Sequence, residues 1–522
     1  LTNYESLLAY SLLGLVGGVA SGLVVLGFEL SIVELARLWG VGNGGEDFES
    51  LPRWAWFALP AGGALLLGGL YSLLKPQDRE AGIVHVLSRM HANYGVLPLR
   101  NAVLQFIGGA FALATGQSGG REGPGVHLGG AINSLLGQRL GLPHNSLRVL
   151  IACGTAGGIA AAFHTPLAGV IFAMEVIVAE YTVVGFIPVM LAAVSASAVS
   201  LSLSGNEPLF ALPAMRTASL GEIPMILLLG FCCGLAVAAF IRLIKVTGNV
   251  AHWPVMVRFT FAGCITGALA LGVPQILGIG YDSLQLVVQG EVALSLLLMI
   301  AACKLVATAT SCGLGLPVGL ISARLGLSLD SDPVLYVVIG MGAAMGAVLN
   351  APLAAILAII EMTHTVSIGL PAMLAIITAT LTNTVMFRQR SAHQAVLRQL
   401  QRIVPDDPLN QLLHRTDVSS VMDNRVVPVP AALQPRDLEP LIEFKPTWCL
   451  LEREEEDLYL VQGGELLEWL GEQALDEDTA IDLTQADIRR WTMTRVPLQA
   501  SLRQAMDTLR AQTVEAAIVA ER

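Results

Sequence analysis

The chain has 522 residues, of which 54% are hydrophobic and only 14% are charged, and its mean hydropathy is +0.65. These values exclude an ordinary soluble globular protein, in which about a quarter of the residues are charged. The formal net charge of -11 comes from the end of the chain, because residues 417–522 hold 21 acidic and 10 basic side chains. Residues 1–416 hold equal numbers of acidic and basic side chains, so their formal charges sum to zero. The sequence therefore predicts a neutral membrane part and a separate, acidic soluble domain.

Long apolar segments recur along the first four hundred residues. They are residues 8–28, 56–74, 149–178, 182–203, 224–241, 296–311, 334–360 and 368–387. A helix needs about 20 apolar residues to cross a hydrocarbon layer roughly 30 Å thick, and several segments reach that length. The 53 glycines are typical of helices that pack closely or break inside the membrane. We predict an all-α polytopic membrane protein.

A charged pair, Arg121 and Glu122, lies among glycines directly before a helix-period segment at residues 126–136. Charged side chains at membrane depth are costly and are usually retained for an ion path or a structural pair. Glycines before a helix leave its first N–H groups uncovered, which favours anion binding. Gly120 and Gly123 also allow close approach to the backbone. The pattern predicts an anion site, with a structural Arg121–Glu122 or similar ion pair as the alternative.

The chain contains an internal repeat. Residues 154–175 and 340–361 align without a gap at an offset of 186. Both segments contain Pro-Leu-Ala, and a glutamate, Glu175 or Glu361, follows nine residues after each proline. Small and apolar residues exchange at most other positions. We interpret the pattern as a duplication rather than as a chance match between segments rich in glycine and alanine.

The duplication divides the membrane part into halves at roughly 1–205 and 215–402. Glycine-rich breaks at 116–125 and 313–319 precede the two repeated segments. Duplicated membrane halves often form an inverted repeat, in which broken helices aim their N-termini at a substrate site between the halves. Both breaks would then deliver backbone N–H groups to one interior point. The residues thus predict an anion pathway between two halves.

These motifs resemble those of the CLC family of chloride channels and chloride/proton antiporters. Residues 120–124 read GREGP, that family's signature, and residues 161–176, AAFHTPLAGVIFAMEV, are similar to its AAFNAPLAGxxFxxEE run. The likeness covers residues 1 to about 402 in order and spacing. It implies a homodimer in a lipid bilayer, with one path for chloride or a related anion in each subunit, built from two inverted halves of broken helices.

The resemblance makes Glu122 the gating residue, whose carboxylate competes with the anion and swings aside when it is protonated. Ala81-Gly82-Ile83 stands where the family pattern is GSGIP, and Ala81 occupies the position of a serine that normally contacts the central anion. Alanine cannot donate that hydrogen bond. Either the N–H groups of Gly82 and Ile83 replace it or the selectivity differs, for instance towards another halide such as fluoride.

Two further positions also depart from the family pattern. Gly319-Leu320-Ile321 stands at the GxFxP motif with only the glycine kept, and a glycine-broken helix start is the alternative reading. His393 occupies the place of a tyrosine that closes the inner end of the path; a solvated histidine is the alternative. The predicted anion-binding positions are Ala81, Gly82, Ile83, Gly120, Arg121, Gly123, Gly319, Leu320, Ile321 and His393.

Val176 bears on proton coupling. Proton-coupled members of the family carry a second acid immediately after the position of Glu175, and a valine cannot relay protons. Val176 therefore favours a passive anion channel, while the retained Glu122 favours an anion/proton antiporter with a non-standard proton route. We expect Glu175 to be a structural acid. The nine histidines lack the paired spacing of a metalloprotease, so we predict neither an enzyme nor a metal site.

The end of the membrane part carries a basic cluster, Arg388, Arg390, Arg398 and Arg402. Basic residues that flank a span favour the cytoplasmic side. We therefore expect a multi-pass protein, in the inner membrane of a bacterium, whose C-terminal domain is cytoplasmic.

Residues 403–416 are predicted to be a linker, because prolines and aspartates there end the last helix. Residues 417–522 resemble a pair of small α/β CBS modules, the second incomplete, with helices at 418–422 and 502–509 that are followed by short strands at 426–429 and 514–519. CBS modules can bind adenine nucleotides, and packing support for the dimer is the alternative. No other cofactor and no nucleic acid is expected.

Overall fold

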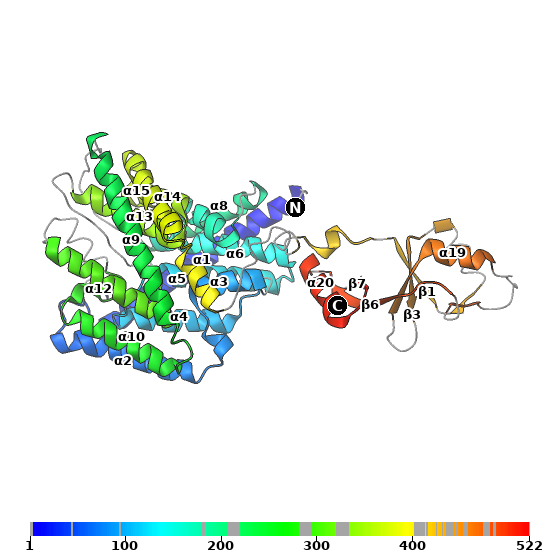
Figure 1. The fold of residues 1–522 in the computed structure, drawn as a ribbon, viewed down its shortest axis with the longest axis horizontal. Coiled ribbons are helices and arrows are strands. Elements are labelled where there is room, and N and C mark those ends of the chain that lie inside the picture. The colour runs from blue at the N-terminus through cyan, green and yellow to red at the C-terminus, as the bar shows by residue number, and fades with distance from the viewer. Residues whose placement is uncertain are drawn as a thin grey trace. The chain divides into compact units, whose positions relative to one another are not determined.

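The chain forms two compact units, Leu1–Leu142 with Ser146–Val404, and Pro143–Asn145 with Pro405–Arg522 (Figure 1). The computed structural model describes residues 4–42, 45–92, 95–179, 183–205, 220–280, 294–319 and 333–400, and most of 413–520. The predicted linker lies largely outside the described residues.

The membrane unit is helical throughout its described part. Its α-helices are α1 (Tyr4–Leu38), α2 (Arg53–Ser72), α3 (Gly82–Ala92), α4 (Leu99–Ala114), α5 (Glu122–Arg139), α6 (His144–Phe163), α7 (Pro166–Phe172), α8 (Val183–Ser204), α9 (Ile223–Gly248), α10 (Val255–Ala270), α12 (Leu294–Gly313), α13 (Pro333–Leu349), α14 (Pro352–Thr363), α15 (Gly369–Leu381) and α16 (Ala392–Gln399). Seven helices of the described chain are long and apolar enough to cross a bilayer. The all-α polytopic prediction is confirmed.

The two longest apolar segments, 149–178 and 334–360, are each divided into two helices rather than continuous. The chain leaves α6 at His164 and α13 at Asn350, both with a left-handed backbone, at φ 54° and 56°. Pro166 and Pro352 then begin the next helix, because proline has no N–H to continue the previous one. The duplication thus extends from the sequence to the backbone conformation.

Two partly buried glutamates connect the repeated segments to each other. Glu175, just after α7, accepts hydrogen bonds from the N–H groups of Leu353 and Ala354 at the start of α14, at 3.4 and 3.0 Å. Glu361, near the end of α14, does the same for the first turn of α7, at 2.9 and 2.8 Å. Each helix start meets the end of the other helix, so α7 and α14 run antiparallel. This exchange is the signature of an inverted repeat and confirms the predicted architecture.

The two caps predict a stability effect. A hydrogen bond to a charged acceptor contributes about 1.5–3 kcal/mol, and a neutral amide keeps only part of it. Glu175→Gln and Glu361→Gln should therefore each lower the free energy of unfolding by about 1 kcal/mol, measured by thermal unfolding in detergent. Glu34→Gln is the control, because Glu34 forms only an exposed pair with Arg37. A loss no larger than in that control would contradict the capping role.

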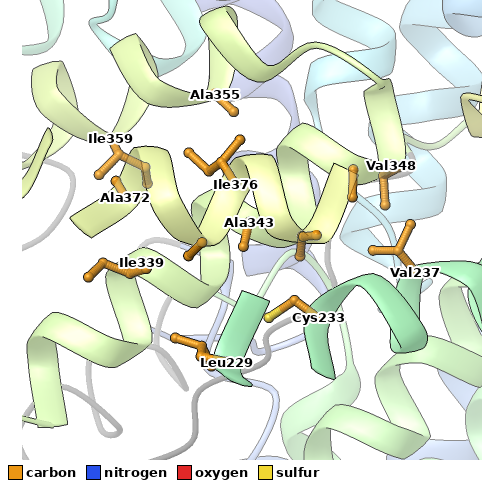
Figure 2. Close-up of a cluster of buried hydrophobic side chains, with 14 of the residues drawn as sticks. Leu229, Cys233, Val237, Ile339, Ala343, Val348, Ala355, Ile359, Ala372 and Ile376 are labelled. Carbon is orange, nitrogen blue, oxygen red and sulfur yellow. The ribbon is translucent and has the colours of Figure 1, made fainter. Parts of the chain in front are cut away.

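The second half of the membrane unit is held by a closely packed core. Figure 2 shows that side chains from α9, α13, α14 and α15 meet around α13. A Cβ added to Gly342 or Gly346 would lie 2.7 Å from Ile359 or Ile376, respectively. Glycine is required at these two positions because the neighbouring helices approach so closely. This packing holds α9, whose end lines the site described below.

The second unit is a small α/β domain. Its main sheet has the order β1-β3-β4-β6-β7. The strands are β1 (Val426–Pro430), β3 (Trp448–Glu452), β4 (Leu458–Gln462), β6 (Trp491–Pro497) and β7 (Ala516–Ala520), with β2 (Ala432–Leu433) and β5 (Ile481–Asp482) paired separately and helices α19 (Gly463–Glu472) and α20 (Leu502–Gln512). β1 and β3 are parallel, as are β6 and β7, while β4 runs antiparallel to both β3 and β6. The predicted strands and helix are found, but 418–422 forms only a short 3-10 turn, Val418–Ser420.

Candidate functional site

The two glycine-rich breaks meet inside the membrane unit. The N–H of Gly120 donates to the carbonyl of Gly319 at 3.2 Å, and the N–H of Gly319 donates back to Gly120 at 2.7 Å. The predicted convergence of the breaks is therefore found. Each of these two N–H groups, however, is engaged by the carbonyl of the other glycine, so the expectation that they point at an anion needs correction. Gly120 and Gly319 instead contribute the space that a side chain at either position would fill.

The carboxylate of Glu122 occupies that space. A Cβ added to Gly120 would lie 2.0 Å from Glu122 Oε2, and one added to Gly319 would lie 2.5 Å from Oε1. The carboxylate therefore lies against the alpha carbons of both glycines. Glu122 is the first residue of α5, and its exposed fraction is 4%. A negative group thus fills the junction of the two halves at the positive end of a helix.

A cavity of about 420 Å³ leads to this junction. The predicted positions in its described lining are Ala81, Gly82, Ile83, Gly123, Gly319 and His393. Residues from α3, α5, α9, α10, α12 and α16 form the wall, so both halves contribute. Leu320 and Ile321 lie outside the described residues. The structure thus brings most of the predicted anion-binding positions around one space.

The start of α3 faces this cavity. Gly82 has a φ of +70°, which favours glycine, and its N–H donates to Gln105 Oε1 at 2.7 Å. Gln105 Nε2 in turn donates to the carbonyl of Pro317 at 3.0 Å, which ties α3 to the break of the second half. The prediction that Gly82 offers its N–H to an anion is therefore corrected. The N–H of Ile83 is the first one of α3 that remains to be considered as an anion donor. Sequence reasoning missed Gln105, although a glutamine in the apolar helix α4 was a visible signal.

Arg121 has a different environment from the one that we expected. Its Nη1 lies 3.1 Å from Glu29 Oε1 of α1, and its Nη2 donates to the carbonyl of Ala162 at 2.6 Å. The guanidinium also lies over the ring of Phe163, 5.5 Å from the centroid. The described lining of the cavity does not include Arg121. The structure thus gives Arg121 a counter-charge on α1, an ion pair of the kind that the alternative proposed, with Glu29 in place of Glu122.

Two arginines that sequence reasoning missed line the cavity, Arg79 and Arg258. Arg258 is the one charged residue of α10, and its buried Nε has no hydrogen-bond partner among the described residues. Arg79 donates to the carbonyl of Leu74 from Nε at 3.0 Å and from Nη2 at 2.6 Å. Cations on the wall of a low-dielectric cavity attract anions strongly. A lone arginine in an apolar helix was the signal in the sequence.

Arg258→Gln is expected to weaken anion binding about fivefold. The loss of one charge near the cavity removes about 1 kcal/mol of attraction, because the effective dielectric near such a site is about 20. The measurement is initial anion flux into liposomes against anion concentration. Arg53→Gln is the matched control, since Arg53 is exposed at the start of α2. An apparent affinity equal to that of the Arg53 variant would contradict the role of Arg258.

His393 lies in the first turn of α16, which Ser391 caps by accepting a hydrogen bond from the N–H of Gln394. It lines the cavity, and its exposed fraction is 2%. Its Nδ1 has no hydrogen-bond partner among the described residues. The alternative of a solvated surface histidine therefore does not fit. An N–H of a buried imidazole facing the cavity can donate to an anion.

Val176 lies in a π-helical segment, Ala173–Val178, which continues α7. Its side chain packs against a hydrophobic cluster that includes Phe172 and Ile177. The neighbouring Glu175 is the cap of α14 described above, as expected for a structural acid. The position at which proton-coupled relatives would carry an acid is thus apolar in packing as well as in sequence.

Three arginines of the predicted basic cluster lie around α16, which also lines the anion cavity. Arg388, Arg390 and Arg398 line a second cavity of about 370 Å³ together with Lys245 of α9. Arg402 lies outside the described residues. No acidic side chain is among the described lining residues, so this surface is strongly positive.

Two inverted halves of broken helices, around a cavity walled by helix starts and arginines, define a polytopic membrane protein with a path for small anions. The sequence model of the family described as "Voltage gated chloride channel" matches residues 63–384. The chain belongs to this family.

Among curated proteins, the chain is 32% identical over 394 residues to a putative chloride channel protein, ClcB-like, from Ralstonia nicotianae, which covers 70% of this chain and 91% of that protein. It is 28% identical over 424 residues to the H(+)/Cl(-) exchange transporter ClcA of Vibrio campbellii, covering 76% and 89%. These likenesses extend across nearly the whole length of the relatives.

Three solved structures share the fold. A slow cyanobacterial Cl-/H+ antiporter matches with a TM-score of 0.66 and 22% identity, over 75% of this chain and 98% of the other. A CLC-type fluoride/proton antiporter matches with a TM-score of 0.64 and 22% identity, over 76% and 99%. A eukaryotic CLC transporter matches over 100% of this chain and 97% of the other, with a TM-score of 0.63 and 19% identity. At these identities the likeness concerns the fold alone.

Proposed function

We propose that the chain carries chloride or a similar small anion across the membrane through the cavity described above, with Glu122 as its gate. The chain is an anion transport protein of its family and not an enzyme. The observation that carries the gate is the position of the Glu122 carboxylate against Gly120 and Gly319. Two negative groups cannot share that junction, so the anion and the carboxylate compete for it. Protonation removes the charge of Glu122 and lets the side chain leave.

The cavity supplies the attraction for the anion. Arg79 and Arg258 raise its local concentration, and the start of α3 aims the positive end of a helix at it. His393 provides a donor at the α16 side of the wall. The anion would pass these groups before it reaches Glu122. Because most of these donors are backbone or fixed cations, the replacement of a serine by Ala81 does not remove the site.

Passive anion flow is the favoured mode of transport. Val176 is apolar and packed among apolar side chains, so the route to Glu122 lacks the acid that would relay protons there. The ClcB-like relative is named a chloride channel, and the ClcA relatives are named exchangers. Proton-coupled exchange is the second candidate, because Glu122 is retained.

Reconstitution in liposomes tests the function. With an imposed chloride gradient, the protein should release chloride while the external pH stays constant. Uphill proton movement that requires Glu122 would instead establish exchange. Bromide, nitrate and fluoride in the same assay define selectivity at the cavity that Ala81 lines. No flux of any of these anions would overturn the proposal.

Two further proposals concern assembly and the soluble domain. We propose that the protein is a homodimer in the bilayer, to be tested by mass measurement in detergent and in lipid nanodiscs. We also propose that the α/β domain is a CBS-like pair, supported by its two parallel strand pairs, β1 with β3 and β6 with β7. Calorimetry of the full chain with adenosine, AMP and ATP tests nucleotide binding; no heat with any of the three would contradict it.

A further inference from the structure

A pair of histidines lies in the wall of the anion cavity, and the transport mechanism above does not use it. His85 of α3 and His127 of α5 are in contact, with Nδ1 of His85 and Nε2 of His127 2.9 Å apart. The rings meet edge to face, with centroids 4.9 Å apart. Both residues are buried, yet His85 also lines the cavity. The pair therefore connects the cavity to the helix that begins with Glu122.

The hydrogen bonds fix the protons of this pair. Arg89 Nε donates to His85 Nε2 at 3.1 Å, so that nitrogen carries no proton. His85 therefore has its proton on Nδ1 and donates it to His127 Nε2. His127 in turn has its proton on Nδ1, which has no hydrogen-bond partner among the described residues. This assignment from the donors and acceptors makes both rings neutral.

A carboxylate lies close enough to pair with His85 once that ring gains a second proton. Glu80 Oε2 lies 3.7 Å from His85 Nε2, and Glu80 also lines the cavity. If Nε2 gains a proton from solvent in the cavity, it becomes a donor and can no longer accept from Arg89. His85 would then exchange its contact with Arg89 for an ion pair with Glu80. The protonation adds one positive charge to the cavity wall.

The charges around His85 decide when this proton binds. Arg89 on its own helix and Arg79 and Arg258 in the cavity wall oppose a further positive charge. His393 of α16 also faces the cavity, and Glu80 is the one acid among the described lining residues. An empty cavity therefore disfavours the protonated pair. An anion in the cavity supplies a second negative charge and reverses this balance.

We propose that the His85–His127 pair is a proton-binding site, which takes up one proton when an anion occupies the cavity. This inference rests on the proposed anion cavity but not on the gate at Glu122. Because linkage is reciprocal, anion affinity increases as the pH falls, by at most tenfold per pH unit for one proton. The pair thereby makes anion uptake sensitive to pH in a protein that carries Val176 at the position where proton-coupled relatives have an acid.

Calorimetry on the full chain in detergent tests this site. Glu122→Gln is the background, because Glu122 would itself take up a proton when an anion displaces it. Chloride is titrated at pH 5.5, 6.5 and 7.5 in buffers of different ionisation enthalpy, which gives the number of protons bound with each anion. We expect net proton uptake, with chloride affinity increasing several-fold from pH 7.5 to 5.5.

Substitutions at the pair locate the proton. His85→Gln and His127→Gln, each in the Glu122→Gln background, should abolish the uptake and make chloride affinity independent of pH. Glu80→Gln should reduce the pH dependence, because the ion pair of the protonated state is lost. His252→Gln is the control, since His252 is exposed and its Nδ1 binds the carbonyl of Asn249, away from the cavity lining. Two independent histidine variants guard against one that fails to fold.

The outcomes separate this inference from the proposed function. Absence of chloride binding in both the wild type and Glu122→Gln would overturn the anion cavity itself. Chloride binding without proton uptake in Glu122→Gln would overturn the histidine site and leave the cavity intact. Uptake that persists in both His85→Gln and His127→Gln but vanishes in His393→Gln would assign the proton to His393 and equally overturn the inference.

Discussion

Gly120→Ala is expected to open the pathway at neutral pH and to reproduce the behaviour of Glu122→Ala. The three heavy atoms nearest to the new Cβ all belong to the Glu122 carboxyl group, at 2.0 to 2.5 Å. A methyl group there displaces a flexible side chain rather than backbone. Overpacking of this kind costs about 1–3 kcal/mol, which shifts the gate about 5- to 150-fold towards its open position. Chloride efflux from liposomes at pH 4.5 and 7.5 measures this shift.

Two matched variants make the Gly120 result specific. Gly69→Ala introduces the same methyl group in α2, where no atom lies within 4 Å, and should leave efflux unchanged. Gly120→Ala combined with Glu122→Ala should behave like Glu122→Ala alone, because the methyl group then has nothing to displace. If Gly120→Ala keeps the efflux and the pH dependence of the wild type, the carboxylate does not occupy the junction.

The second large effect concerns the pair between Arg121 and Glu29. Arg121→Leu should destabilise the protein by about 3–5 kcal/mol, because it leaves the buried carboxylate of Glu29 without its counter-charge. Arg121→Leu combined with Glu29→Leu should recover most of that loss, since replacing both partners with apolar side chains is often close to neutral. Denaturant unfolding in mixed micelles measures the free energy of unfolding of each variant.

Transport by the double variant separates the structural and anion-binding roles of Arg121. If Arg121 only holds the loop before α5 to α1, the folded double variant still conducts chloride. If its guanidinium binds the anion, the double variant is folded but conducts poorly. A single Arg121→Leu variant as stable as the wild type would contradict the ion pair as a structural element.

Local sequence patterns predicted the features that local chemistry decides. The repeated Pro166 and Pro352 indicated the duplication, although the helix break before each of them was not predicted and was found only in the structure. Glutamates nine residues further on predicted structural acids, and the structure shows Glu175 and Glu361 as reciprocal caps. The glycines around Glu122 indicated a close backbone approach, which the Gly120–Gly319 pair provides.

Partners that are distant in the sequence could not be predicted in this way. Nothing in the residues near Arg121 identifies Glu29 of α1 as its counter-charge, because their contact depends on how helices pack. Gln105 likewise accepts a hydrogen bond from the N–H of Gly82 only because α4 passes beside the start of α3. Arg258 was visible as a lone charge, but its place in the cavity wall depends on the crossing of α10 with other helices. Helix periodicity predicts which face of a helix is buried, but it does not predict which helix packs against that face.

Chloride binding to the wild type and to Glu122→Gln at pH 7.5, measured by calorimetry, tests the competition at the junction most directly. The carboxylate and chloride exclude each other there, so the neutral glutamine should give tighter chloride binding, and the difference should diminish as acid protonates Glu122 in the wild type. Equal affinity of the two proteins at pH 7.5 would contradict Glu122 as the gate of this pathway.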